Sequence, residues 1–251
     1  MVPDLIFDIG MHEGADTAYY LAKGFRVVAV DANPALCEAA RSRFSAEIKY
    51  GRLTVLNVGI AEEVGELDFY ICKDQSDWSS FIPEYALRAG ATEVIRIRCI
   101  TLDMLMRDFG VPYFCKIDIE GSDRAAVMAL RRLDNFPRYV SVEATVGDFC
   151  DIMSALGYGG FKIINQYHIA SVLPISPPLE GCFCDAKIVP GLHSGPFGDE
   201  SYGRWLTPEE FTEEYRRLRE KDFYGSEAEA AGVPFEQYHR WCDFHAKLGP
   251  I

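Results

Sequence analysis

The sequence predicts an α/β fold with a mostly parallel sheet and helices on both faces. Short apolar runs alternate with amphipathic helical patterns through the first 190 residues, as parallel α/β sheets require. The first runs are almost continuously apolar, which is typical of strands buried on both faces. With 251 residues, 49% of them hydrophobic, the chain is long enough to bury one sizeable core.

Buried strands are expected at residues 5–9, 26–31, 53–58, 113–119 and 139–143, and residues 161–164 and 182–189 complete a seven-stranded sheet. Helices are expected over residues 16–23, from Pro34, after Thr101 and from about Ser122. Residues 67–71 and 94–99 alternate apolar with polar or amphipathic side chains, which indicates half-buried strands beside the core.

The pattern changes after about residue 190, so we expect a main domain over residues 1–190 and a helical extension over residues 191–251 packed on it. Thr207 and Glu210 form a capping box with Pro208 at the first helical position, which predicts a helix start. Residues 235–248 carry a second amphipathic stripe that predicts another helix, with its aromatic face buried.

Composition narrows the classes of function. A net charge of −13 argues against a nucleic-acid partner, because an acidic surface repels phosphate backbones. No run approaches the roughly 18 apolar residues that a membrane span needs, and no signal peptide is recognised, so no membrane partner and a cytoplasmic location are expected. The eight cysteines are expected to be reduced, since Cys182 and Cys184 lack zinc-site spacing.

The strongest local motif follows the first predicted strand. Asp8, Gly10 and Gly14 stand between that strand and a helix, and glycine there lets the backbone turn sharply close to a ligand. The G-x-G-x-x-G pattern of a diphosphate site is absent, because His12 stands at its second glycine. The spacing therefore favours a nucleoside ligand without a diphosphate and with an amino-acid tail.

A carboxylate at the end of the second strand supports this interpretation. Asp31 lies where a carboxylate can accept hydrogen bonds from the two ribose hydroxyls. Nicotinamide cofactors use an acidic residue at the same place, so Asp31 indicates an adenosine ligand without selecting the cofactor. The alternative is a solvated carboxylate at a strand end.

Two further carboxylates lie at the end of the strand over residues 113–119. Asp118 and Glu120 would share one face there, at the sheet edge where open α/β sheets bind ligands. They can hold an amino group, position an acceptor hydroxyl or serve as a base. The alternative for Glu120 is a contact with the positive end of the next helix.

These motifs resemble the FkbM family of methyltransferases. The family's order is seen in FDIGMHEG (7–14), VDANP (30–34), TLD (101–103) and KIDIEG (116–121). The resemblance covers about residues 5–165. It implies a Rossmann-like class I methyltransferase fold, S-adenosylmethionine as the donor, and usually O-methylation of sugars or natural products.

By position, the resemblance maps donor binding onto Asp8, Gly10, Gly14 and Asp31, and Asn57 at the end of the third strand is a further candidate. The predicted donor-binding residues are Asp8, Gly10, His12, Gly14, Asp31, Asn57 and Asp118. Asp31 departs from the glutamate of many relatives, and its shorter side chain should still reach ribose. The region after residue 190 is not explained by the family pattern.

Transfer of an activated methyl group needs alignment and a base for the acceptor's proton. The predicted catalytic residues are Asp118, Glu120 and His168, and the predicted substrate residues are Trp78, Ser79, Glu143 and His193. Each histidine has an alternative structural interpretation. Nothing in the sequence requires a divalent metal, and no metal site is predicted.

Two other functions are compatible with the fold. One is an NAD(P)-dependent oxidoreductase, which the missing glycine pattern disfavours, and the other is a non-catalytic binding module. As partners we expect a small-molecule or glycan substrate, and an aromatic helical tail could also bury a homodimer contact.

Overall fold

The chain divides into two compact units. The computed structural model describes residues 1–87 and 92–251, and the units are Met1–Pro137 and Arg138–Ile251. The predicted division near residue 190 stays a prediction.

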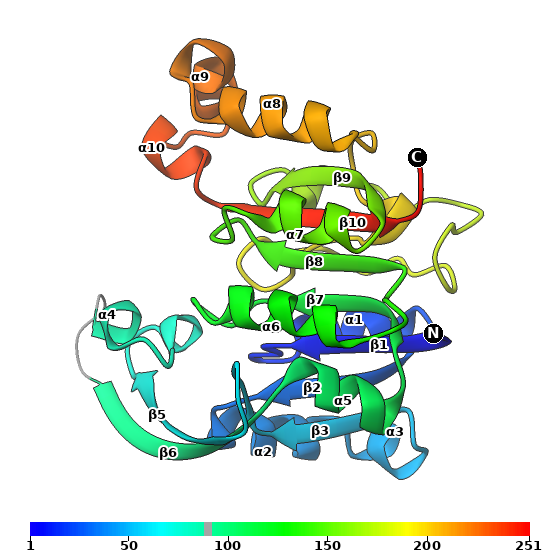
Figure 1. Cartoon of the computed structure of the whole chain (residues 1–251), viewed down its shortest axis with the longest axis vertical. Helices are drawn as coiled ribbons and strands as arrows, with labels where there is room; N and C mark the ends of the chain where they lie inside the picture. Colours follow the sequence, from blue (N-terminus) through cyan, green and yellow to red (C-terminus); the bar gives the residue numbers. More distant parts are fainter. Residues whose placement is uncertain (88–91) are drawn as a thin grey trace. The chain divides into compact units, whose positions relative to one another are not determined.

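The first unit holds four parallel strands (Figure 1). They are β1 (Val2–Ile9), β2 (Arg26–Asp31), β3 (Leu53–Asn57) and β7 (Pro112–Ile117), in the order β3-β2-β1-β7. Neighbouring side chains on one strand, such as Ile6 and Phe7, are both fully buried. Burial on both faces explains why these runs read as continuously apolar in the sequence.

Helices cover both faces of these strands. The helices of the first unit are α1 (Ala15–Ala22), α2 (Pro34–Arg43), α3 (Ser45–Lys49), α4 (Pro83–Ala86), α5 (Leu102–Phe109) and α6 (Asp123–Ala129). In Figure 1, α5 and α6 lie in front of the strands, and α1 and α2 lie behind them. Asn33 caps α2 through its side chain, whereas Thr101 stands at the start of α5 without a side-chain capping bond.

A separate three-stranded sheet confirms the two half-buried strands. Its strands are β4 (Gly59–Ile60), β5 (Gly65–Cys72) and β6 (Thr92–Ile100), in the order β4-β6-β5. Phe69 lies opposite Ile95 in the antiparallel pair, while Asp68 and Arg96 form an exposed ion pair at 3.2 Å. Alternation along these strands therefore separates an apolar face from a charged one.

The second unit adds three strands and four helices. They are β8 (Tyr139–Glu143), β9 (Tyr158–Asn165), β10 (Cys242–Leu248), α7 (Phe149–Ala155), α8 (Pro208–Leu218), α9 (Lys221–Ala230) and α10 (Phe235–Tyr238). Strand β10 lies between β8 and β9 and is antiparallel to both. The strands of the seven-stranded, mostly parallel sheet follow the order β3-β2-β1-β7-β8-β10-β9.

The predicted helix over residues 235–248 is wrong beyond its first turn. Only α10 is helical, and β10 follows it as a strand. As the middle strand of three, β10 buries neighbouring side chains such as Phe244 and His245. In a strand buried on both faces, apolar residues can stand at every position, including those three or four residues apart. The spacing alone therefore could not distinguish this strand from a helix.

The predicted strand over residues 182–189 is also wrong. This segment contains no strand, and β10 is the strand that pairs with β9. Pro177 and Pro178 precede the segment, and proline removes donors that a sheet ladder needs. The capping box of α8 is confirmed, since Thr207 and Glu210 make both of its reciprocal hydrogen bonds.

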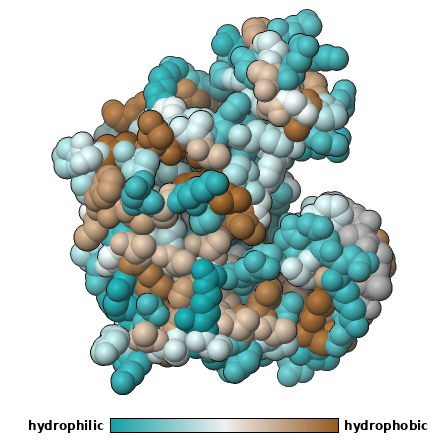
Figure 2. All heavy atoms as spheres, turned by 180° about the vertical axis from the view of Figure 1, so that it is seen from behind, coloured by the Kyte–Doolittle hydropathy of each residue, from teal (hydrophilic) through white to brown (hydrophobic). Residues whose placement is uncertain are grey.

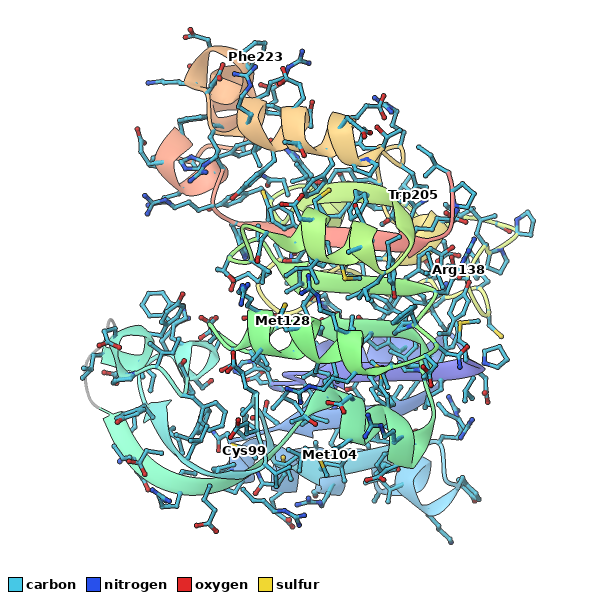
Figure 3. The ribbon with its side chains drawn as sticks, viewed as in Figure 1. Cys99, Met104, Met128, Arg138, Trp205 and Phe223 are labelled. Carbon is cyan, nitrogen blue, oxygen red and sulfur yellow. The ribbon has the colours of Figure 1, made fainter. Side chains whose placement is uncertain are left out.

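A buried lysine and a buried histidine lie opposite each other on β9 and β10. Lys162 pairs with His245 in register, and both are 3% exposed. The Lys162 ammonium donates to the Ser201 carbonyl at 2.7 Å and lies 4.5 Å from the ring centre of Trp205. Trp205 is labelled in Figure 3. Burial lowers the pKa of Lys162 to about 8 and that of His245 to about 3.

Hydrophilic and hydrophobic residues are mixed on the face shown in Figure 2, and hydrophilic ones predominate there. No helix in the described part of the chain is both long and apolar enough to cross a membrane. All eight cysteines are free thiols, and all except Cys182 and Cys184 are buried. That these cysteines are reduced stays a prediction.

Candidate functional site

The turn between β1 and α1 is held in a conformation that requires glycine. Gly10 has a φ of +86° and Gly14, which begins α1, has a φ of +74°. A Cβ atom on Gly10 would lie 1.8 Å from the carbonyl oxygen of Asp118. The turns that follow β1 and β7 therefore touch through their backbones, which only glycine permits.

The carboxylate of Asp31 faces this turn from the end of β2. Its Oδ2 accepts a hydrogen bond from the backbone N–H of His12 at 2.9 Å, and its Oδ1 accepts one from that of Asn33 at 2.8 Å. Each oxygen keeps a second lone pair, enough for the two hydroxyls of a ribose. Burial is the main cause that raises the pKa of Asp31 to about 6.

Asn57 supports the Asp31 turn from the end of β3. Its side-chain amide donates to the carbonyl oxygens of Asp31 and Ala32, both at 3.0 Å. This contact fixes the backbone that carries the carboxylate. The predicted contact between Asn57 and a ligand stays a prediction.

Asp8 lies in β1, directly before the turn that leads to α1, and supports that turn. Its side chain is fully buried, and its Oδ2 accepts a hydrogen bond from the Thr17 hydroxyl at 2.6 Å. Burial raises the pKa of Asp8, although the nearby Lys116 ammonium opposes that shift. The structure thus gives Asp8 a role in shaping the turn, and its direct contact with a ligand stays a prediction.

A single buried ammonium connects the two turns. Lys116, at the end of β7 and 4% exposed, donates to the Gly10 carbonyl at 3.0 Å. Its Nζ also lies 3.4 Å from Asp118 Oδ2, 3.5 Å from Asp8 Oδ1 and 3.7 Å from Asp16 Oδ2. The Asp118 side chain is 44% exposed, so this carboxylate is the accessible member of the group.

The turn after β7 is strained in the same way as the turn after β1. Glu120 and His12 are the non-glycine residues with positive φ in the described part of the chain, each at +48°. Asp123 holds the strained turn by accepting hydrogen bonds from the backbone N–H groups of Ile119 at 3.1 Å and Gly121 at 3.0 Å. Such strain persists only where surrounding contacts fix it, and it clusters at functional sites.

The segment that carries Trp78 is fastened to both turns. The His12 ring Nε2 hydrogen-bonds the Ser76 hydroxyl at 2.7 Å, and the Ser80 hydroxyl donates to the Glu120 carbonyl at 2.6 Å. Trp78 ends the short 3₁₀ helix η1 (Ser76–Trp78) and is 37% exposed. These contacts bring together the predicted donor-binding, catalytic and substrate residues of the first unit.

Ser79 braces this segment. Its hydroxyl donates to the Ser76 carbonyl at 2.8 Å and accepts from the Cys72 N–H at 3.1 Å. These bonds fix the conformation that displays Trp78. The predicted contact between Ser79 and a substrate stays a prediction.

The other three predicted site residues lie in the second unit. Glu143 ends β8 and is partly buried. The His168 ring Nε2 hydrogen-bonds the Tyr238 hydroxyl at 2.7 Å, and the His193 ring accepts a hydrogen bond from the Val189 N–H at 3.2 Å. Both histidines thus have structural contacts, and their functional roles stay predictions.

Several residues of the site were missed by the sequence analysis. Lys116 was named only as part of a motif, and no role was given to Asp16, Thr17, Ser76 or Asp123. One signal was available, because a lysine inside an apolar strand must find partners when it is buried. The positions of Thr17 and Ser76 carried no comparable signal, since hydroxyl residues are common on helices and loops.

Together, the parallel sheet and these turns define a Rossmann-like α/β protein whose site suits a nucleoside ligand. A family model described as the methyltransferase FkbM domain matches residues 8–163. The chain therefore belongs to the FkbM methyltransferase family. No curated protein matched the chain.

Solved structures resemble the chain only distantly. An FkbM methyltransferase from Methylobacillus flagellatus KT is 20% identical, with a TM-score of 0.39, and the match covers 56% of this chain and 32% of that one. The StiE O-MT structure is 10% identical, with a TM-score of 0.41 and coverage of 98% and 68%. A precorrin-6y C5,15-methyltransferase from Geobacter metallireducens GS-15 is 12% identical, with a TM-score of 0.33 and coverage of 74% and 75%.

The chain thus spans about a third of the length of the Methylobacillus protein. The activity, substrates and partners of the whole protein are accordingly proposals, which rest on the site of the first unit.

Proposed function

We propose that this protein uses S-adenosylmethionine to methylate a hydroxyl group of a sugar, a glycan or a small natural product. The observation that carries the proposal is the pairing of the Gly10 turn with the Asp31 carboxylate. Two lone pairs on Asp31 suit ribose hydroxyls, and the turn lacks the second glycine that a diphosphate needs. Membership of the FkbM family supports methyl transfer.

When bound, the sulfonium of the donor supplies an activated methyl group, and transfer to the acceptor oxygen is an in-line displacement. The protein must align the two reactants, and this alignment supplies a large part of the rate enhancement. One base must also take the proton of the acceptor hydroxyl as the new carbon–oxygen bond forms. The two carboxylates of the turn after β7, Asp118 and Glu120, are the proposed bases.

Glu120 is the better candidate for that base because its backbone is fixed on both sides. Its carbonyl accepts the Ser80 hydroxyl bond, and Asp123 holds the N–H groups of the residues before and after it. Asp118 lies 3.4 Å from the Lys116 ammonium, and its side chain is 44% exposed, so the carboxylate is accessible to the donor's ammonium group.

Calorimetry with S-adenosylmethionine, S-adenosylhomocysteine and NAD tests the proposed cofactor. We expect micromolar binding of the two adenosyl compounds and no measurable binding of NAD, because the turn after β1 offers a diphosphate no glycine-lined approach. Binding of NAD alone would instead support an oxidoreductase. Binding of none of the three would support a non-catalytic module.

A second measurement tests the base. The Glu120→Gln variant is expected to bind S-adenosylhomocysteine within threefold of the wild type and to lose methyl transfer to sugar or small hydroxylated acceptors by a factor of about 10²–10⁴, the usual contribution of a general base. Asp118→Asn serves as the comparison, since it should weaken donor binding. Near-normal transfer by Glu120→Gln would remove Glu120 from the mechanism.

A further inference from the structure

We propose that Lys116 is the positioning residue of the donor site. Its ammonium holds the Gly10 carbonyl and compensates the charge of three carboxylates, so the turn is formed before any donor binds. The inference rests on the proposed function, because it assigns Lys116 to the site that would hold the adenosyl donor.

The geometry places the ammonium at the meeting point of three segments. Asp8 comes from β1, Asp16 from the first turn of α1, and Asp118 from the end of β7, and all three carboxylates lie within 3.7 Å of the Lys116 nitrogen. The hydrogen bond from the Lys116 ammonium to the Gly10 carbonyl joins β7 to the residue whose φ is +86°. A shift of this ammonium would therefore move the turn itself.

The distribution of charge around Lys116 also assigns it to the donor site. Lys116 contributes one positive charge beside three carboxylates, and Asp8 and Asp16 are almost completely buried. Asp31 and Asp123 extend the acidic group, since Asp31 interacts electrostatically with Asp8 and Asp123 with Asp118. Removal of the ammonium would take away the positive charge that lies beside these carboxylates, and breaking a buried ion pair in this way is far more costly than the loss of packing alone.

Loss of the Lys116 ammonium should reverse the direction in which donor affinity changes with pH. In the wild type, donor affinity should fall as the pH drops towards 6, because Asp31 must be ionised to accept the ribose hydroxyls. Without Lys116, protonation of one of the three carboxylates would reduce the negative charge that the ammonium no longer offsets. Affinity should then rise as the pH drops from 8 to 6.5.

The experiment measures S-adenosylhomocysteine affinity by calorimetry between pH 6 and 8.5. For the Lys116→Met variant we expect affinity about 100-fold below the wild type at pH 8, as for loss of a buried charge partner, and a partial recovery at pH 6.5. A purely space-filling lysine would give a loss that is the same at every pH. That uniform loss, or a loss of less than threefold, overturns the inference.

Two further variants serve as controls. Lys162→Met removes another buried lysine that also donates to a backbone carbonyl, and it should lower the melting temperature without changing affinity. The double variant with Lys116→Met and Asp16→Asn removes one repelling carboxylate, and it should recover at least tenfold of the lost affinity at pH 8.

Failure of the inference differs from failure of the proposed function. If the wild type binds no S-adenosylhomocysteine, the proposed function fails, and the melting temperatures of the ligand-free proteins still test Lys116. The Lys116→Met protein should then become more stable relative to the wild type as the pH falls from 8 to 6.5. Should Lys116→Met not fold, a double variant that is equally unfolded overturns the charge-compensation argument.

Discussion

Replacing Gly10 by alanine is expected to abolish donor binding. The new Cβ atom would lie 1.8 Å from the Asp118 carbonyl oxygen, so the turns after β1 and β7 would have to separate. An alanine at a φ of +86° also costs about 1–2 kcal/mol of backbone strain. We expect S-adenosylhomocysteine affinity to fall at least about 100-fold, measured by calorimetry, since positioning errors near 1 Å have effects of this size.

The chain offers a matched control for this prediction. Gly157 has a φ of +89°, and a Cβ atom built on it meets no heavy atom within 4 Å. Gly157→Ala therefore carries the same backbone strain without the collision, and it should lower the melting temperature while leaving affinity unchanged. Affinity within threefold of the wild type for Gly10→Ala would contradict the close approach of the two turns.

The second large effect is expected at Asp31. The Asp31→Asn variant replaces one carboxylate oxygen by an amide NH₂ group. This donor would then face the backbone N–H donor of either His12 or Asn33, and that hydrogen bond would be lost. The variant also removes the charged acceptor of the ribose hydroxyls. Hydrogen bonds to charged groups contribute about 1.5–3 kcal/mol each, so affinity for S-adenosylhomocysteine should fall about 100-fold at pH 7.5.

The pH dependence tests the same carboxylate. The pKa of Asp31 is about 6 in the free protein, above its ordinary value, so the neutral form is increasingly populated below pH 6. Because the ligand binds the ionised form, wild-type affinity should be about tenfold lower at pH 5 than at pH 7.5. Binding near pH 6 should release protons, which calorimetry in buffers of different ionisation enthalpy detects.

Comparison of the variants separates the possible causes. The pKa of Asp123 is also about 6, so protonation of Asp123 is a second possible cause of the decline in affinity. If Asp31 is the cause, the Asp31→Asn variant should lose that decline. Asp4→Asn, at an exposed ion pair with Arg26, should keep both the affinity and its pH profile. An unchanged decline towards pH 5 in Asp31→Asn would exclude Asp31 as the titrating group.

The sequence predicted the first half of the fold well because its signals were local. Strands β1 and β2 are continuous apolar runs with glycine or proline nearby. They follow each other along the chain, pair with each other and are buried on both faces. The motifs that follow β1 and β2 placed Gly10 and Asp31 correctly at strand ends. The strand expected over residues 113–119 was wrong at its end, because β7 stops at Ile117 and Glu120 lies in the turn after it with a φ of +48°. Parallel strands present their carboxyl ends at one sheet edge, so order along the chain was sufficient.

The second half could not be predicted in the same way. Strand β10 joins the sheet from the far end of the chain, and its position between β8 and β9 depends on long-range pairing. The spacing of Tyr238, Cys242 and His245 suits a helix and a doubly buried strand equally. The Lys116 contacts were also invisible, because its partners Asp8 and Asp16 are distant in sequence and only the fold brings them together.

The fastening of the Trp78 segment has a consequence for how such enzymes diversify. One of its two links, from Ser80, reaches a backbone carbonyl, which every amino acid at that position would supply. The stretch between the anchors can therefore exchange side chains over generations while the scaffold beneath stays constant. Under the proposed function, side-chain changes in this stretch would alter the choice of acceptor without disturbing the two turns beneath it.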